Sequence, residues 1–206
     1  MTFRYADLDP RKKAFVFELD DVLYPKQDYL FQVYYLFAAF IEHTEQWKSK
    51  MMIGSMTETY LQHGEDAVFT TLKKAFCLDE KYQENFNRLL TTAHLPLKLL
   101  LYRQMLELLQ QIVVDRKQIF ILTNGNPQQQ LNKIRQIEWN GLENYLTCYF
   151  AEEIKPKPEP DALHHILDKH QLQRRDIIMI GNQTADELCA QAAGVDYINL
   201  RDFIWQ

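Results

Sequence analysis

Three carboxylates stand within four positions of this chain: Glu18, Asp20 and Asp21. They directly follow the apolar run Ala14–Phe17, whose aromatic and β-branched residues predict a buried parallel strand. Unpaired carboxylates are costly to bury, so we expect them where this strand leaves the core. In a parallel α/β sheet, ligands bind at the carboxyl ends of the strands. The spacing therefore predicts a site at this strand end, with Glu18 and Asp20 on the same side of the extended chain.

Polar residues also follow three further predicted strands, at 118–122, 147–151 and 177–180. The residues at these strand ends are Thr123, Asn124 and Gly125, then Lys155 and Lys157 in the segment KPKPEP, then Asn182 and Asp186. Phosphoryl transfer requires an in-line nucleophile, a proton donor for the leaving oxygen and positive charge around the other oxygens. A hydroxyl, backbone amides beside a glycine and an ammonium group supply suitable partners for phosphate. Each position alone indicates little, but together they predict a phosphate site.

Helical patterns separate the strands. Helices are predicted at 97–114, 127–138, 160–170 and 185–193, and a fifth strand is predicted at 197–200. Strands that alternate with helices favour right-handed crossovers. The predicted fold class is α/β, with a doubly wound parallel sheet.

The segment 26–94 carries no strand pattern and predicts a helical insertion after the first strand. A length of about 70 residues is sufficient for a small helical bundle. Apolar residues between Leu30 and Ile41 follow helical spacing. Two further helices are expected at 56–75 and 79–92, with Thr57 and Asp79 as N-caps and turns at Gly54 and Gly64.

The segment 17–25, with the sequence FELDDVLYP, resembles the first motif of the haloacid dehalogenase (HAD) superfamily, where many phosphatases read FDLDDTLYP. The strand ends at Thr123, in the proline-rich segment and in IIMIGNQTADE are similar to the family's other three motifs, and they occur in the family's order. The resemblance implies a HAD-like α/β core at 1–24 and 95–206 with a helical cap at 25–94. It also implies a Mg²⁺-dependent phosphomonoester phosphatase of a small phosphorylated metabolite, with a nucleotide as one candidate.

The resemblance further implies a role for each site residue. The catalytic residues are Glu18, Asp20, Thr123 and Lys157, of which Asp20 handles the protons; phosphate is bound by Thr123, Asn124, Gly125 and Lys157; and Mg²⁺ is held by Glu18, the Asp20 carbonyl, Asn182 and, in the outer shell, Asp186. Lys157 fits the family's K-P-x-P better than Lys155, which is the alternative. Asn182 lacks the charge of the family's aspartate, so Mg²⁺ is expected to bind weakly.

Glu18 departs from the motif at the position of the aspartate nucleophile. Glutamate can act as a nucleophile. However, its extra methylene moves the attacking oxygen by about 1 Å, and misplacement on that scale can lower a rate about a hundredfold. Reduced turnover is therefore expected, with a non-catalytic module that binds a phosphorylated ligand or a protein partner as the alternative. A substitution made to trap a ligand is a third interpretation, whereas a dehalogenase fits poorly because it too needs the aspartate.

The bulk composition describes an ordinary polar surface, with a net charge of −5 and 25% charged residues. This balance argues against a broad nucleic-acid footprint. Neither a leader sequence nor an apolar run of membrane-spanning length is recognised. The three cysteines, Cys77, Cys148 and Cys189, are expected to be reduced core thiols of a cytoplasmic protein. The sequence leaves the oligomeric state open.

Overall fold

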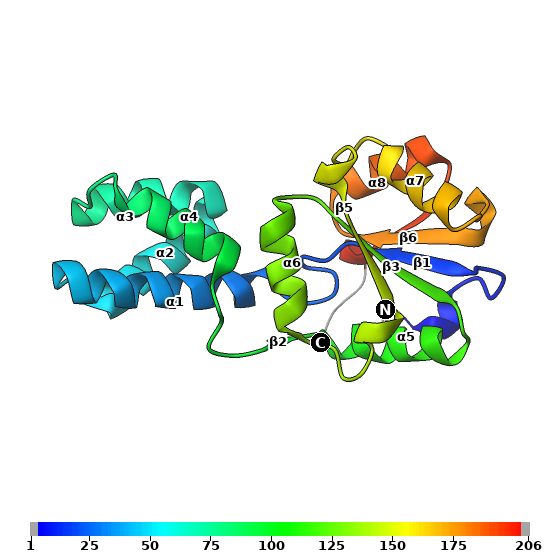
Figure 1. Ribbon diagram of the computed structural model, residues 1–206, viewed down its shortest axis with the longest axis horizontal. Coiled ribbons are helices and arrows are strands. Elements are labelled where there is room, and N and C mark those ends of the chain that lie inside the picture. The colour runs from blue at the N-terminus through cyan, green and yellow to red at the C-terminus, as the bar shows by residue number, and fades with distance from the viewer. Residues whose placement is uncertain (1–3, 203–206) are drawn as a thin grey trace.

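The computed structural model describes residues 4–202 and contains a five-stranded sheet in the order β5-β3-β1-β6-β7 (Figure 1). The strands are β1 (Ala14–Phe17), β3 (Gln118–Thr123), β5 (Leu146–Phe150), β6 (Ile177–Gly181) and β7 (Asp196–Asn199). All neighbouring strands of this sheet are parallel. The predicted α/β class and parallel sheet are confirmed. All four residues of the central β1 are buried, in accordance with its apolar sequence.

Helices cover both faces of the sheet. They are α5 (Arg103–Val114), α6 (Pro127–Gln136), α7 (Asp161–Lys169) and α8 (Thr184–Ala193). Alternate side chains of β1 enter different cores, because successive residues of a strand point to opposite faces. Phe15 and Phe17 join the core that includes α5, whereas Ala14 and Val16 join the core beneath α7 and α8.

The cap comprises α1 (Lys26–Glu45), α2 (Ser49–His63), α3 (Val68–Phe76) and α4 (Tyr82–Thr92), and it lies at one end of the molecule beside the sheet (Figure 1). Aromatic rings hold these helices together. The Phe37 ring lies 5.0 Å from that of Phe86 and 6.2 Å from that of Phe69, both in edge-to-face geometry. Such ring pairs stabilise a core beyond the area that they bury.

Two expectations for the cap helices were wrong. Residues 56–75 do not form one helix, because α2 ends before Gly64, whose φ of 83° interrupts the helical backbone. Thr57 and Gly54 lie inside α2 and are neither a cap nor a turn. Packing outweighs the low helix propensity of glycine here, since α2 has its own buried face. Asp79 precedes α4 and accepts a hydrogen bond from the Lys81 amide, but it is not the N-cap.

The helix expected at 97–114 begins only at Arg103, because Leu99–Leu100 forms a short strand, β2. It pairs in parallel with β4 (Ile137–Glu138), so the helix expected at 127–138 ends at Gln136. Short apolar runs have too little periodicity to distinguish a strand from a helix. The helices and strands near the other strand ends lie within two residues of their predicted bounds.

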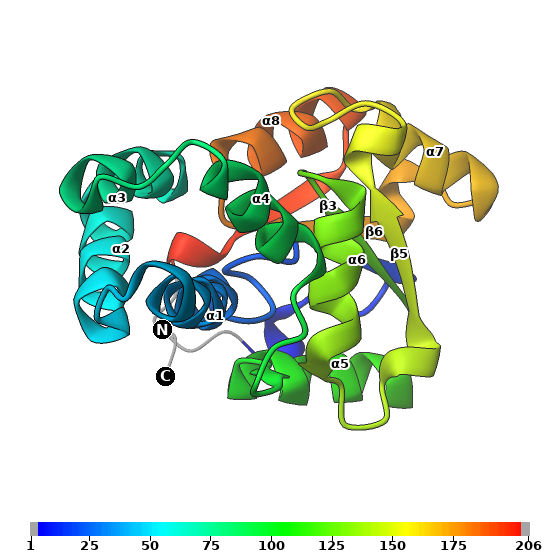
Figure 2. The ribbon, with the colours of Figure 1, turned by 60° about the vertical axis from the view of Figure 1, so that its left-hand side comes forward.

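Helix α6 lies between the cap and the sheet (Figure 2). Its Gln136 side chain accepts a hydrogen bond from the Leu95 amide at 2.6 Å and donates to the Ala93 carbonyl at 3.0 Å. Asn132 donates to the same carbonyl at 2.9 Å. The segment that returns from the cap is thereby tied to the core helix that begins just after Thr123.

The cysteines differ in exposure. Cys189 is buried and Cys148 half-buried, but Cys77 is exposed at the end of α3, so its expected place in the core was wrong. All three are free thiols. Within residues 4–202, no helix is both long and apolar enough to cross a membrane.

Candidate active site

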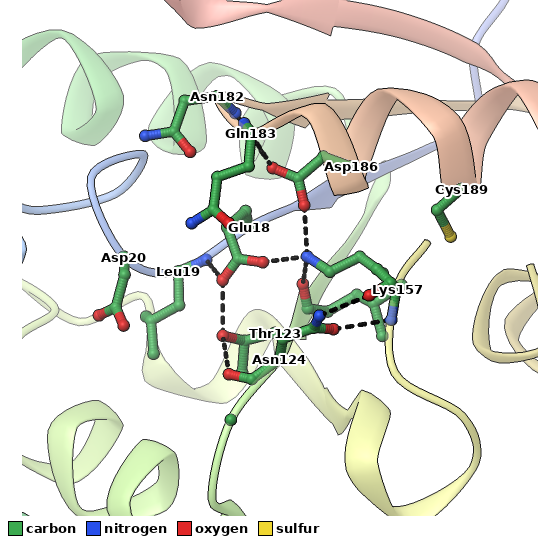
Figure 3. A network of polar contacts seen from close by, with 12 residues as sticks. Glu18, Leu19, Asp20, Thr123, Asn124, Lys157, Asn182, Gln183, Asp186 and Cys189 are labelled. Carbon is green, nitrogen blue, oxygen red and sulfur yellow. Dashed lines mark hydrogen bonds and ion pairs between the residues drawn. The ribbon is translucent and has the colours of Figure 1, made fainter. Parts of the chain in front are cut away.

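Four of the expected site residues lie in one buried polar network (Figure 3). Glu18 follows β1, Thr123 ends β3, Lys157 precedes α7, and Asp186 lies in the first turn of α8. The parallel register places Phe17 beside both Ile121 and Ile180, so these strands end at one edge of the sheet. The fold therefore brings together residues from four distant parts of the chain.

The Glu18 carboxylate is bound by three donors. Its Oε1 accepts hydrogen bonds from the Leu19 amide at 2.8 Å and from the Thr123 hydroxyl at 2.5 Å, and its Oε2 is paired with the Lys157 ammonium. Burial raises the pKa of Glu18; the Lys157 charge opposes this rise, while the nearby Asp186 carboxylate adds to it. The carboxylate points into the protein rather than to solvent.

The Lys157 ammonium also contacts the Leu122 carbonyl at 3.1 Å and Asp186 Oδ1 at 2.6 Å. Together with Glu18, these acceptors use all three of its donors. Burial alone would lower the pKa of Lys157, but the two carboxylates outweigh burial and raise it. Only 1% of this side chain is exposed, so the charge is held inside the network.

The Asn124 side chain fixes the backbone of Lys157. Its amide donates to the Lys157 carbonyl at 2.9 Å, and its oxygen accepts from the Lys157 backbone amide at 2.9 Å. Lys155, the alternative phosphate lysine, instead forms an exposed ion pair with Asp161 at 2.9 Å. The geometry therefore places Lys157, not Lys155, in the network.

Asp186 holds the start of α8 as well as Lys157. Its Oδ2 accepts from the backbone amides of Asn182 at 3.2 Å and Gln183 at 3.0 Å, as a capping carboxylate does. The Asp186 side chain also approaches Gly181 so closely that a Cβ atom there would lie 2.5 Å from Oδ2. Asp186 is therefore tightly enclosed, with both oxygens occupied.

Asp20 lies on the other side of Leu19 from the network and has its own partners (Figure 3). It accepts from the Tyr24 hydroxyl at 2.7 Å and from the Lys133 ammonium at 2.6 Å. Burial alone would raise the pKa of Asp20, but the Lys133 charge and the hydrogen bonds from Lys133 and Tyr24 lower it. Asp20 is therefore held as a carboxylate.

Gln130 links the two clusters, donating to the Thr123 hydroxyl at 2.6 Å and, over a longer 3.4 Å, to Asp20 Oδ2. The sequence reasoning missed Gln130 and Lys133, since a polar helix ordinarily faces solvent. Their spacing was a signal. Residues three apart share a helix face, and α6 begins just after the strand end at Thr123.

The expected magnesium ligands do not form a suitable site as the side chains lie. The Asn182 Oδ1 is buried without a partner and could accept a cation, but the Glu18 and Asp186 carboxylates are occupied by other donors. Mg²⁺ requires near-octahedral oxygen coordination. In residues 4–202, no group of three His, Cys, Asp or Glu side chains could hold a metal ion. The donor set of the native chain therefore does not fit Mg²⁺.

Comparison with known sequences decides the family. The sequence profile of haloacid dehalogenase-like hydrolases matches residues 15–200. The chain belongs to this family. Over 66 residues this HAD-like hydrolase is also 36% identical to the phosphoglycolate phosphatase of Photobacterium profundum. That match covers 31% of the chain and 29% of the relative, so it spans less than a third of the relative's length.

Solved structures of HAD hydrolases resemble the whole fold. A subfamily IA hydrolase of Geobacter sulfurreducens has a TM-score of 0.63 at 19% identity, covering 92% of this chain and 87% of that one. A HAD hydrolase of Bacillus subtilis, described as bound to magnesium, has a TM-score of 0.61 at 17% identity, covering 91% and 86%. At these identities the likeness shows the fold alone. HAD hydrolases generally use Mg²⁺, which makes the altered ligands of this member informative.

Proposed function

We propose that this HAD-like hydrolase is a phosphomonoester phosphatase of a small phosphorylated metabolite whose turnover is strongly reduced by Glu18. One observation carries the proposal: Glu18, Thr123 and Lys157 contact one another directly at the strand ends, and Gln130 joins Asp20 to them. The phosphatase class is supported by the 36% identical segment of phosphoglycolate phosphatase. A nucleotide is one candidate substrate. The free cysteines support a cytoplasmic location, and neither nucleic acid nor a membrane is proposed as a partner.

Each residue has a distinct part in the proposed reaction. A carboxylate at position 18 attacks phosphorus, while Thr123 and Lys157 stabilise the charge on the phosphoryl oxygens. The leaving oxygen takes a proton from residue 20, which then takes a proton from the water that releases phosphate. The lowered pKa of Asp20 favours the second transfer over the first. Glu18 cannot attack from its observed position without leaving Thr123 and Lys157, which explains reduced turnover.

Mg²⁺ dependence belongs to the proposal through the restored ligands only. Because the native donors do not fit the ion, no step of the native reaction is assigned to it. We propose that an aspartate at position 182, in addition to one at position 18, restores the charge that Mg²⁺ requires.

The substitution Glu18→Asp tests the proposal. It shortens the side chain by one methylene, which frees Thr123 and Lys157 for a phosphoryl group. We expect hydrolysis of p-nitrophenyl phosphate with Mg²⁺ to rise by about a hundredfold over the native protein, and further with Asn182→Asp. Adding Asp20→Asn to the restored protein is the control and should abolish the gain. Vigorous hydrolysis by the native protein would contradict the proposed effect of Glu18.

A non-catalytic binding module is the second candidate. It is favoured by the complete internal use of the Lys157 donors and by the metal ligands that, within residues 4–202, do not converge. If Glu18→Asp with Asn182→Asp folds but stays inert, the pocket has diverged beyond these two positions. The binding module would then replace the phosphatase as the proposed function.

A further inference from the structure

We infer that the Glu18 carboxylate is a built-in occupant of the phosphate position, so that the native protein excludes phosphate there and gains an anion site when this carboxylate is removed. The inference rests on the proposed function in one respect, because it takes Thr123 and Lys157 as the phosphate donors. It concerns binding alone and requires no turnover.

The partners of Glu18 are of the types that bind phosphate. They comprise a backbone amide from Leu19, a hydroxyl from Thr123 and an ammonium group from Lys157. Charge-assisted hydrogen bonds of this kind are among the strongest in proteins, and they serve carboxylates and phosphates alike. The glutamate thus satisfies, from within the chain, donors suited to a bound anion.

No donor of Lys157 is left for a second anion. Its three protons are taken by Glu18, Asp186 and the Leu122 carbonyl, and the Thr123 residue is fully buried. The Gly125 amide, another expected phosphate donor, faces the Glu152 carboxylate at 3.4 Å. Phosphate could enter only by displacing a carboxylate of the protein.

The charges lead to the same conclusion. Two carboxylates, Glu18 and Asp186, share the single ammonium of Lys157, so a phosphate would add negative charge to a group that already has an excess. Buried like charges repel strongly because little solvent screens them. Removing the Glu18 carboxylate leaves one carboxylate with one ammonium. Asp186 retains its hydrogen bonds to α8, so the variant should keep its fold.

The experiment measures phosphate binding by calorimetry and by the melting temperature, at constant ionic strength set with chloride. The native protein should show no saturable response to phosphate. Glu18→Ala should bind phosphate and show a melting temperature that rises with its concentration, as ligand linkage requires. Glu18→Gln provides a second variant that keeps most of the side-chain volume. It should bind less phosphate than Glu18→Ala, because its side chain still fills the space.

Two controls isolate the site. Asp176→Ala removes a carboxylate that pairs with Lys13 outside the network, so it should leave the phosphate response unchanged. Adding Lys157→Met to Glu18→Ala should abolish the gained binding. Saturable binding by the native protein as tight as that of Glu18→Ala would overturn the inference, and so would a folded Glu18→Ala or Glu18→Gln that both bind none.

The result is distinguishable from a failure of the proposed function. If Glu18→Ala binds phosphate while Glu18→Asp remains inert, the phosphatase proposal fails and the built-in occupant stands. If Glu18→Asp hydrolyses esters while the native protein binds phosphate at the site, the phosphatase stands and the built-in occupant fails.

Discussion

The buried ion pair between Asp20 and Lys133 offers a sharp test of the site's electrostatics. The Lys133 side chain is 2% exposed and that of Asp20 11% exposed, with 2.6 Å between the charged atoms. Its ammonium also lies 5.2 Å from the centre of the Tyr29 ring, which links the pair to the cap. The substitution Lys133→Met removes the charge while retaining most of the side-chain volume.

Breaking a buried ion pair by removing one partner destabilises a protein by about 3–5 kcal/mol, because the remaining charge is uncompensated. In a chain of this length, 1 kcal/mol shifts the melting temperature by about 2–4 °C, so Lys133→Met should lower it by roughly 6–20 °C. Asp20→Asn combined with Lys133→Met leaves no unpaired charge. This double variant should recover most of the loss.

The pH dependence has a definite sign. The native pKa of Asp20 is lowered, so its contribution to stability is present above the unfolded pKa and is lost as pH falls through the folded pKa. In Lys133→Met, burial acts without the opposing charge and raises the pKa of Asp20. The destabilisation should therefore be largest near pH 7 and shrink toward pH 4, where Asp20 takes up a proton.

Denaturant unfolding followed by circular dichroism at both pH values measures these effects. A Lys133→Met protein within about 1 kcal/mol of the native protein at pH 7 would refute the reasoning, since the expected loss is about 3–5 kcal/mol. An equal loss at pH 7 and pH 4 would refute the electrostatic cause and indicate a packing defect instead.

Two further predictions concern the cap and the thiols. The Tyr34 hydroxyl is buried without a hydrogen-bond partner, so Tyr34→Phe should leave the free energy of unfolding unchanged or raise it by about 1 kcal/mol; a clear loss in denaturant unfolding would reveal a partner. Burial raises the pKa of Cys148 and of Cys189 to about 11, so an aromatic disulfide reagent at pH 8 should modify only the exposed Cys77 in the native protein and all three cysteines after unfolding. Rapid modification of a second thiol would contradict the burial.

The sequence was sufficient to predict the sheet because its signal is local. Buried parallel strands such as β1 are continuous apolar runs, and the residues that follow them must lie at one edge of the sheet. That rule alone placed Thr123 and Lys157 near Glu18. The helix bounds in the cap were less predictable, because α2 continues through Gly54 for the sake of its buried face.

The partners within the site could not be predicted, because they depend on contacts between distant residues. Glu18 lies 105 residues before Thr123 and 139 before Lys157, and no local pattern indicates which donors its longer side chain reaches. Lys133 likewise looks like an ordinary surface lysine on a polar helix. Its burial follows only from the packing of α6 between the cap and the sheet.

Crystal structures of the native protein and of Glu18→Asp, both grown in phosphate, test the central claim most directly. We predict that the native crystal shows the Glu18 carboxylate between Thr123 and Lys157, with no anion there. The Glu18→Asp crystal should instead show phosphate in contact with both residues. Phosphate bound to Thr123 and Lys157 in the native crystal, with Glu18 turned away, would contradict the account.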